Sequence, residues 1–254
     1  MDGPTPAISP ENLYRSLGSG AAPLVIDVRR PGDFDADDRL IAGAIRHPPD
    51  ELAHWRETLP PGRPVVVYCV EGAAVGEAAA AALAAAGHEA AYLAGGIRAW
   101  REAGRPTRRR VAATGRWVTR ERPKVDRIAC PWLISRFIDP EAEFLYVPSA
   151  DVRDVALRRD AIPFDIEGAQ FGHVGDRCSF DAFIDIFGLE DAALDRLALI
   201  VRGADTGKPA LTPQSPGLLA LSQGLSATIA DDHAMLAHGM VVYDALYAWC
   251  RAAA

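Results

Sequence analysis

Short runs of apolar residues, separated by polar turns, fill the first hundred positions of the chain. Residues 24–28 and 65–69 form two such runs, and their length and β-branched content predict buried strands. The second run leads into a tight loop and then into an alanine-rich segment, residues 77–86, which predicts a helix. A third short strand is expected to end at Gly95 and Gly96, where another helix begins. The pattern therefore predicts strands that alternate with helices.

The second half of the chain shows longer helical segments and few strands. Apolar spacings of three and four residues predict helices over residues 191–202, 216–229 and 231–251. A further helix is expected to start at Cys130 with Pro131 in its first turn, and another over residues 180–187 with Ser179 as N-cap. Residues 143–147 and 162–166 predict short strands. We expect a mainly helical α+β domain with a small sheet.

The length of the chain and the distribution of its charges indicate two domains joined by a linker. The chain has 254 residues, 49% hydrophobic and 24% charged, whereas a common domain has about 100 to 150 residues. The net charge is −7, yet residues 104–127 carry nine basic and two acidic side chains. This stretch also contains prolines and glycines, which is typical of a linker. We expect domains at residues 1–103 and 125–254, joined by a basic linker at residues 104–124.

Targeting signals and cysteine spacing indicate the compartment. No apolar run approaches the roughly 18 residues of a membrane span, and the first residues lack the basic and apolar parts of a signal peptide. We therefore expect a cytoplasmic protein with no membrane partner. The chain has no C-x-x-C pair, which favours reduced thiols, and three of its four cysteines are expected in a core: Cys130, Cys178 and Cys250.

The fourth cysteine, Cys69, is the strongest chemical signal. It ends a predicted strand and stands before a loop and a helix, so its thiol is expected above the free N–H groups of a helix N-terminus. Such a position favours a thiolate or a bound anion. The alternative is that Cys69 is a small hydrophobic residue buried at a strand end.

Three blocks around Cys69 resemble the rhodanese family of sulfurtransferases. They are D-V-R-x-P-x-x-F at residues 27–34, I-x-G-A-I at residues 41–45 and G-G-x-x-x-W at residues 95–100, and the resemblance covers about residues 10–103. It implies an α/β domain with a parallel sheet, in which Cys69 carries sulfane sulfur as a persulfide between a small sulfur donor and a thiol acceptor. It also implies an active-site loop made of Val70, Glu71, Gly72, Ala73, Ala74, Val75 and Gly76.

The loop departs from the family pattern in its charge. Family members that use thiosulfate often carry two arginines in C-R-x-G-x-R, whereas this chain has Val70 and Ala74 there and adds Glu71. An anionic donor is then expected to depend on backbone N–H groups and the helix dipole, which contribute about 0.3 to 2 kcal/mol. A persulfide, polysulfide or protein-bound donor stays open. Val75 argues against a phosphatase or arsenate-reductase loop, which has an arginine at that position.

The second half resembles the C-terminal domain of the ChrB family of bacterial chromate-resistance proteins. The resemblance covers about residues 117–251 and is carried by K-V-D-R-I-A-C-P-W-L-I at residues 124–134 and R-G-A-D-T-G at residues 202–207. It implies a role in the chromate stress response, and some members regulate transcription. Chromate is a tetrahedral dianion, which arginine donors suit. Candidate residues for binding chromate or a similar oxyanion are Arg127, Arg136, His173, Arg177, Arg202, Lys208 and His233.

A metal ion is the competing interpretation of the same region. His173, Asp181, Asp205, His233 and His238 are ligand types that could converge, although the spacing is not diagnostic. His233 and His238 are five residues apart, about 140° around a helix, which does not suit one ion. No cofactor is certain on these grounds.

Two functions remain open. The leading hypothesis is a chromate-resistance protein that combines a Cys69 sulfurtransferase module with an oxyanion-responsive domain. The alternative is a non-enzymatic regulator with a degenerate rhodanese scaffold, in which Arg108, Arg109 and Arg110 contact DNA phosphates or a partner protein.

Overall fold

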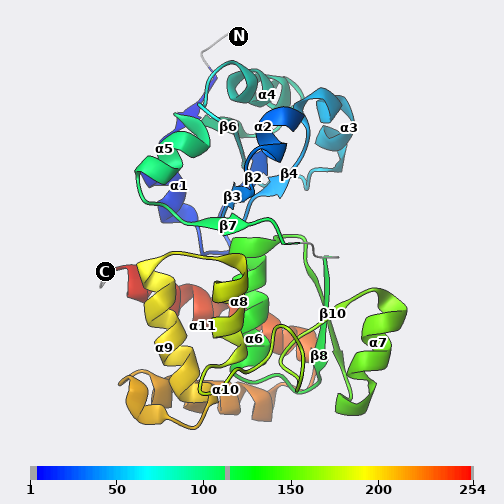
Figure 1. Cartoon of the computed structure of the whole chain (residues 1–254), viewed down its shortest axis with the longest axis vertical. Helices are drawn as coiled ribbons and strands as arrows, with labels where there is room; N and C mark the ends of the chain where they lie inside the picture. The colour runs from blue at the N-terminus through cyan, green and yellow to red at the C-terminus, as the bar shows by residue number, and fades with distance from the viewer. Residues whose placement is uncertain (1–4, 112–114, 253–254) are drawn as a thin grey trace. The chain divides into compact units, whose positions relative to one another are not determined.

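The computed structural model describes residues 5–111 and 115–252. The chain divides into two compact units: the first is Met1–Arg110 with Arg136–Pro140, and the second is Val111–Ser135 with Glu141–Ala254 (Figure 1). The start of the chain, used above in the search for a signal peptide, lies in part outside the described residues. None of the helices in the described ranges is long and apolar enough to cross a membrane.

The basic segment at residues 104–124 is more structured than the expected linker. It contains β7 (Thr107–Arg109), which belongs to the first unit, and β8 (Arg116–Arg120), which belongs to the second. Trp117 and Val118 are fully buried between the two arginines of β8, and this burial explains why the segment forms a strand. Residues 112–114, which lie between the strands, are outside the described part.

A five-stranded parallel sheet forms the centre of the first unit, in the order β1-β6-β5-β2-β4. Its middle strands β2 (Leu24–Asp27) and β5 (Val65–Tyr68) are entirely buried, as expected for a parallel sheet covered on both faces. This confirms the predicted α/β parallel-sheet domain. The other strands are β1 (Ala7–Ile8), β4 (Ile45–Arg46) and β6 (Ala90–Leu93).

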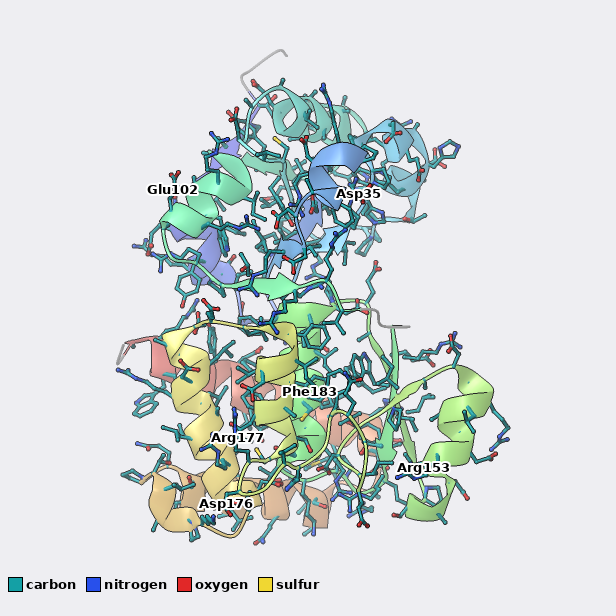
Figure 2. The ribbon with its side chains drawn as sticks, in the orientation of Figure 1. Asp35, Glu102, Arg153, Asp176, Arg177 and Phe183 are labelled. Atoms are coloured by element: carbon teal, nitrogen blue, oxygen red, sulfur yellow. The ribbon has the colours of Figure 1, made fainter. Side chains whose placement is uncertain are left out.

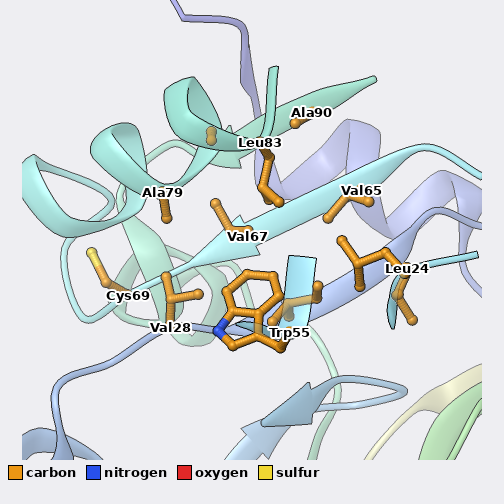
Figure 3. Close-up of a cluster of buried hydrophobic side chains, with 12 residues drawn as sticks. Leu24, Val28, Trp55, Val65, Val67, Cys69, Ala79, Leu83 and Ala90 are labelled. Carbon is orange, nitrogen blue, oxygen red and sulfur yellow. The ribbon is translucent and has the colours of Figure 1, made fainter. Parts of the chain in front are cut away.

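Alternate residues of β2 and β5 point into two separate cores. Leu24, Val65 and Val67 belong to one core, which also contains Ala79 and Leu83 of α4 (Figure 3). The opposite core contains the intervening residues of the same strands and Trp100 of α5. The helices of this unit are α1 (Pro10–Ser16), α2 (Pro31–Asp35), α3 (Leu52–Trp55), α4 (Ala74–Ala85) and α5 (Gly96–Glu102), and β3 (Arg39–Ile41) pairs antiparallel with β7.

The second unit is mainly helical with a small sheet, as predicted. Strand β8 lies between β9 (Glu143–Val147) and β10 (Ile162–Pro163), and both pairings are parallel. The predicted strand at residues 143–147 is therefore confirmed, whereas the one predicted at residues 162–166 is shorter and ends at Pro163. The helices are α6 (Asp126–Leu133), α7 (Val152–Arg159), α8 (Ser179–Phe187), α9 (Ala192–Asp205), α10 (Ser215–Thr228) and α11 (Asp232–Ala252).

The start of α6 differs from the prediction. The helix begins at Asp126 rather than Cys130, so Pro131 lies inside it and cannot donate to the carbonyl of Arg127. The hydroxyl of Tyr146 donates to that carbonyl instead, at 3.0 Å. This hydrogen bond from β9 explains why the helix tolerates an internal proline. A smaller difference concerns α8, in which Ser179 is the first helical residue and Cys178 is the N-cap.

Aromatic packing holds the second unit together. Trp117 packs at 5.2 to 6.5 Å from three phenylalanine rings, those of Phe164, Phe171 and Phe183, and Phe183 is labelled in Figure 2. Trp132 of α6 contacts rings of α8 and α11. These aromatic contacts pack α6 against α8 and α11. Asp126, the first residue of α6, is buried as well.

Candidate functional site

Cys69 follows β5 directly and precedes the loop that leads into α4 (Figure 3). Its side chain is 7% exposed, and its thiol donates to the carbonyl of Ala73 at 3.7 Å. The turn before α4 spans residues 70–73, so three residues expected in the loop, Ala74, Val75 and Gly76, form the first turn of the helix instead. The thiol therefore lies beside the N-terminus of a twelve-residue helix.

The paired glycines of α5 hold this loop in place. Gly72 has a positive φ of 63°, and a Cβ there would lie 2.2 Å from the carbonyl oxygen of Leu93. A Cβ at Gly96 would lie 2.4 Å from the carbonyl oxygen of Cys69. The N–H groups of Ile97 and Arg98 donate to the carbonyls of Cys69 and Val70. Only glycine permits this close approach, which explains the G-G block of the sequence.

The loop offers free backbone N–H groups, although the carbonyl oxygen of Ala73 faces the thiol. Within the described residues, no backbone N–H of residues 70–75 donates to a protein acceptor. The first N–H groups of a helix lack intrahelical partners and carry the positive end of its dipole. The N–H groups of the loop are therefore free to donate to a persulfide or a bound anion.

Two arginines from outside the loop line the cavity at Cys69. The cavity has a volume of about 450 Å³ and is lined by Arg30, Asp33, Cys69, Val70, Glu71, Ala73, Ala74, Val75 and Arg98. Arg30 caps α2 and is exposed, and across the described ranges it has no ion-pair partner. Arg98 pairs with Glu71 at 2.7 Å. The start of α2 and the helix α5 therefore place two cations at the wall of this cavity, which the loop sequence did not indicate.

The D-V-R block forms a buried ion pair beside this cavity. Arg29, 1% exposed, donates to both oxygens of the fully buried Asp27 at 2.6 to 3.1 Å and to Asp37 at 2.8 Å. Arg46 donates to the carbonyls of Asp27 and Arg29. The network ties the carboxyl end of β2 to the segment that carries Arg30. Its role is to position the wall of the cavity.

Most of the cations proposed as oxyanion ligands face carboxylates. Arg202 binds both oxygens of Asp181 at 2.6 and 2.9 Å. Arg177 pairs with Asp185 at 2.6 Å, and Lys208 pairs with Asp176 at 2.7 Å (Arg177 and Asp176 are labelled in Figure 2). His233 packs edge-on against Tyr146. Arg136 belongs to the first unit, together with residues 137–140. Arg177, Arg202 and Lys208 are therefore each paired with an aspartate.

One group of sequence candidates does converge, and it is acidic. The Nε2 atom of His173 lies 3.1 Å from Asp205, 3.4 Å from Asp165 and 3.5 Å from Asp126. Asp126 opens α6 and Asp205 ends α9, so two helix termini meet there. Arg127 and Arg120 contact the far oxygen of Asp165, at 3.4 and 2.8 Å.

Of the five weak metal candidates, the structure brings together only His173 and Asp205, and it adds two residues that the sequence reasoning missed. Asp126 lies inside the K-V-D-R motif and Asp165 follows β10, but nothing in their sequence spacing links them to His173. The other three candidates, Asp181, His233 and His238, lie outside this cluster as the described residues define it.

The electrostatics of the cluster reflect burial and close carboxylates. Burial raises the pKa of Asp126, and burial with the charges of Asp126 and Asp165 raises the pKa of Asp205 to about 7. Contacts with the carboxylates of Asp126 and Asp165 raise the pKa of His173 to about 10. Burial alone would raise the pKa of Asp165, but hydrogen bonds from His173 and Arg120 outweigh it and lower that pKa. Burial and the close carboxylates therefore both oppose the loss of protons from this cluster.

The arginines proposed to contact DNA are partly engaged within the first unit. Arg108 donates to the carbonyl of Ala44 at 2.9 Å, and Arg110 lies 4.3 Å above the ring of Phe34. Arg109 is exposed. Two of the three cations of this stretch therefore contribute to intradomain contacts.

Comparisons with known proteins agree with this architecture. The rhodanese-like domain model matches residues 9–103, and the ChrB C-terminal domain model matches residues 117–250. Protein ChrB of Cupriavidus metallidurans is 42% identical over 132 residues, which cover 52% of this chain and 39% of that protein. The chain thus spans well under half the length of this relative.

Solved structures similar to the first unit include two bacterial or archaeal proteins. A rhodanese-related protein from Thermoplasma volcanium is 29% identical, with a TM-score of 0.36, covering 40% of this chain and 96% of that one. A protein of unknown function from Rhodopseudomonas palustris, described as a possible tyrosine phosphatase, is 25% identical, with a TM-score of 0.36, covering 40% and 83%.

The fold and the Cys69 loop define a protein with an N-terminal rhodanese-like domain. By its second domain, which fills more than half of the chain, the protein belongs to the ChrB C-terminal domain family. The chain therefore combines a rhodanese-like domain with a ChrB C-terminal domain.

Proposed function

We propose that the rhodanese-like domain is a sulfurtransferase in which Cys69 carries sulfane sulfur, and that it acts in the cytoplasm as part of chromate resistance. The observation that carries this proposal is the position of the thiol. It lies beside the N-terminus of α4, in a cavity of about 450 Å³ that Arg30 and Arg98 also line.

The first step is attack of the Cys69 thiolate on the outer sulfur of an anionic donor such as thiosulfate. The new bond joins Sγ to that sulfur, the S–S bond of the donor breaks, and sulfite leaves with the electron pair. The N–H groups of the loop stabilise the resulting persulfide anion, and Arg30 neutralises charge on the donor.

The second step regenerates the thiolate. A small thiol acceptor, as its thiolate, attacks the terminal sulfur of the persulfide and leaves with it as a new persulfide, so that no external oxidant or reductant is needed. The openness of the cavity to solvent at Arg30 and Arg98 gives such an acceptor access.

Intact-mass spectrometry tests the proposal directly. The protein is incubated with thiosulfate or a polysulfide, and one added sulfur atom is expected that cyanide or a thiol removes. Cys69→Ser should lose the adduct, and Cys250→Ser, which changes a buried thiol elsewhere, should keep it. If no adduct forms with either donor, the non-enzymatic regulator becomes the better account.

An oxyanion-responsive second domain is a separate part of the proposal. Here an anion would have to compete with Asp181 for Arg202, which is 23% exposed. Chromate is then expected to raise the melting temperature of the wild-type protein but not of Arg202→Gln, with Arg158→Gln as control because Arg158 pairs only on the surface with Asp154. An unchanged melting temperature in the wild type would remove this part.

A further inference from the structure

The cluster around His173 presents donors at the spacing of a metal coordination sphere. Asp126, His173 and Asp205 each offer one ligand atom, and these three atoms lie within 4.8 Å of one another. The Nε2 atom of His173 is 3.1 Å from Asp205 and 3.5 Å from Asp126. With metal–donor bonds of about 2.1 Å, neighbouring donors of a tetrahedral or octahedral ion lie about 3.0 to 3.5 Å apart.

Asp126 supplies an independent reason to expect a ligand. Its side chain is 1% exposed. Its Oδ2 atom lies 3.5 Å from Nε2 of His173 and accepts from Ser179, whereas its Oδ1 atom has no hydrogen-bond partner among the described residues. Leaving a buried carboxylate oxygen without a partner costs about 1 to 3 kcal/mol or more. A bound cation would satisfy this oxygen.

Neighbouring groups already orient the donors. The backbone N–H of Ser179 donates to Oδ2 of Asp126 at 2.5 Å, and the N–H of Asp126 contacts Oδ1 of Asp205 at 3.4 Å. Asp165 accepts hydrogen bonds from Ser179 and Arg120, and its Oδ1 atom lies 3.4 Å from Nε2 of His173. Such outer contacts normally fix the orientation of metal ligands.

The charge of the site fits a dication better than an anion. Two carboxylates and a neutral imidazole balance two positive charges, whereas a chromate-like dianion would face three carboxylates within 3.5 Å of the imidazole. Among the described residues, the converging ligand group contains no cysteine. An imidazole together with carboxylates suits first-row transition metals rather than Mg²⁺ or Ca²⁺.

We propose that Asp126, His173 and Asp205 bind a divalent first-row transition-metal ion, such as Zn²⁺ or Mn²⁺, in the ChrB-type domain. The ion would connect the start of α6, the loop that carries His173 and the end of α9. This proposal does not depend on the sulfur chemistry of Cys69, so either can fail alone.

Isothermal titration of the chelator-treated full chain with Zn²⁺ tests the site, in a Cys69→Ser background that removes the accessible thiol. One equivalent is expected to bind. His173→Gln and Asp205→Asn should each weaken binding by about tenfold or more. Matched controls are His238→Gln and Asp185→Asn, which remove the same side-chain types outside the cluster and should bind as the parent does.

A second readout reports the ligands themselves. Co²⁺ bound at this site should give visible absorption bands that both cluster variants lose and both controls keep. Circular dichroism spectra of the His173 and Asp205 variants serve as the folding control and should match the spectrum of the parent. These two positions are chosen because they are partly exposed, so the buried Asp126 need not be altered. The proposal is overturned if the parent binds less than a tenth of an equivalent of Zn²⁺. It is also overturned if either cluster variant loses less than about tenfold in affinity.

Discussion

The guanidinium of Arg98 lies 2.7 Å from the carboxylate of Glu71, and both side chains line the cavity of Cys69. Each is more than half exposed, so the pair contributes about 0 to 1 kcal/mol to stability. Its main consequence is electrostatic, because Glu71 occupies the cation that would otherwise face an anionic donor. The pair links the active-site loop to α5 and sets the charge of the cavity.

Glu71→Gln is therefore expected to raise the rate of sulfur transfer from thiosulfate by several fold, because it releases Arg98 towards the donor. Arg98→Gln should lower the same rate. Persulfide formation, followed by mass spectrometry at low and high salt, measures both, and the difference should shrink as salt screens the charges. Glu57→Gln, which removes a carboxylate that does not line the cavity, is the control. Equal rates in Glu71→Gln and Arg98→Gln would contradict this role.

The ion pair of Asp27 and Arg29 is expected to hold the first unit together. Asp27→Asn leaves a guanidinium that is 1% exposed without its bidentate partner, which typically costs about 3 to 5 kcal/mol. Hydrogen exchange of the β2 and β5 amides measures the loss locally. Asp35→Asn is the control, because it alters a carboxylate that is 78% exposed. The β2 and β5 amides of this variant should exchange at the rate of the parent. Unchanged protection in Asp27→Asn would show that the network is dispensable.

Thiol reactivity should separate the four cysteines. Cys69 lines a cavity, whereas Cys130, Cys178 and Cys250 are fully buried and burial raises the pKa of each thiol. Iodoacetamide is expected to label the native protein once, at Cys69, and the other three only after unfolding. Peptide mapping by mass spectrometry identifies the labelled residue. Early labelling of Cys178 would show that the second unit opens more readily than its packing indicates.

Hydrophobic pattern predicted most of the elements because each buries a regular set of side chains. The strands around residues 24–28 and 65–69 and the helices α9 to α11 follow directly from apolar spacing. The start of α6 could not be placed in this way. Pro131 was predicted in the first turn, but it lies inside the helix, where Tyr146 donates to the carbonyl that the proline leaves without a donor. Such a tertiary contact leaves no mark in the local sequence.

The candidate sites show the same limit. Motif spacing predicted Cys69 and its loop, since they are contiguous in the chain. Arg30, Arg98 and Asp126 were missed because three-dimensional packing alone places them near their partners. The carboxylates opposite Arg177 and Arg202 were missed for the same reason. The sequence shows which side chains carry a charge, but it does not show which charged side chains pair with one another.

The stacking of His47 on Trp55 predicts a pH effect on stability. The ring centroids lie 4.9 Å apart at an interplanar angle of 11°, and burial, with the charge of Arg46, lowers the pKa of His47 below 6.5 in the folded state. The unfolded chain therefore binds this proton more readily than the folded one. The resulting stability is fully present above pH 6.5 and is lost as pH falls towards the folded pKa.

We expect the urea midpoint of the first unit to fall between pH 7.5 and pH 5 by more in the parent than in His47→Gln, which cannot gain the proton. Tryptophan fluorescence, to which Trp55 contributes, measures this midpoint at both values. His88→Gln changes a histidine away from this stack, and its pH dependence should match that of the parent. If His47→Gln and the parent lose the same stability on acidification, protonation of His47 does not cause the loss, and other groups do.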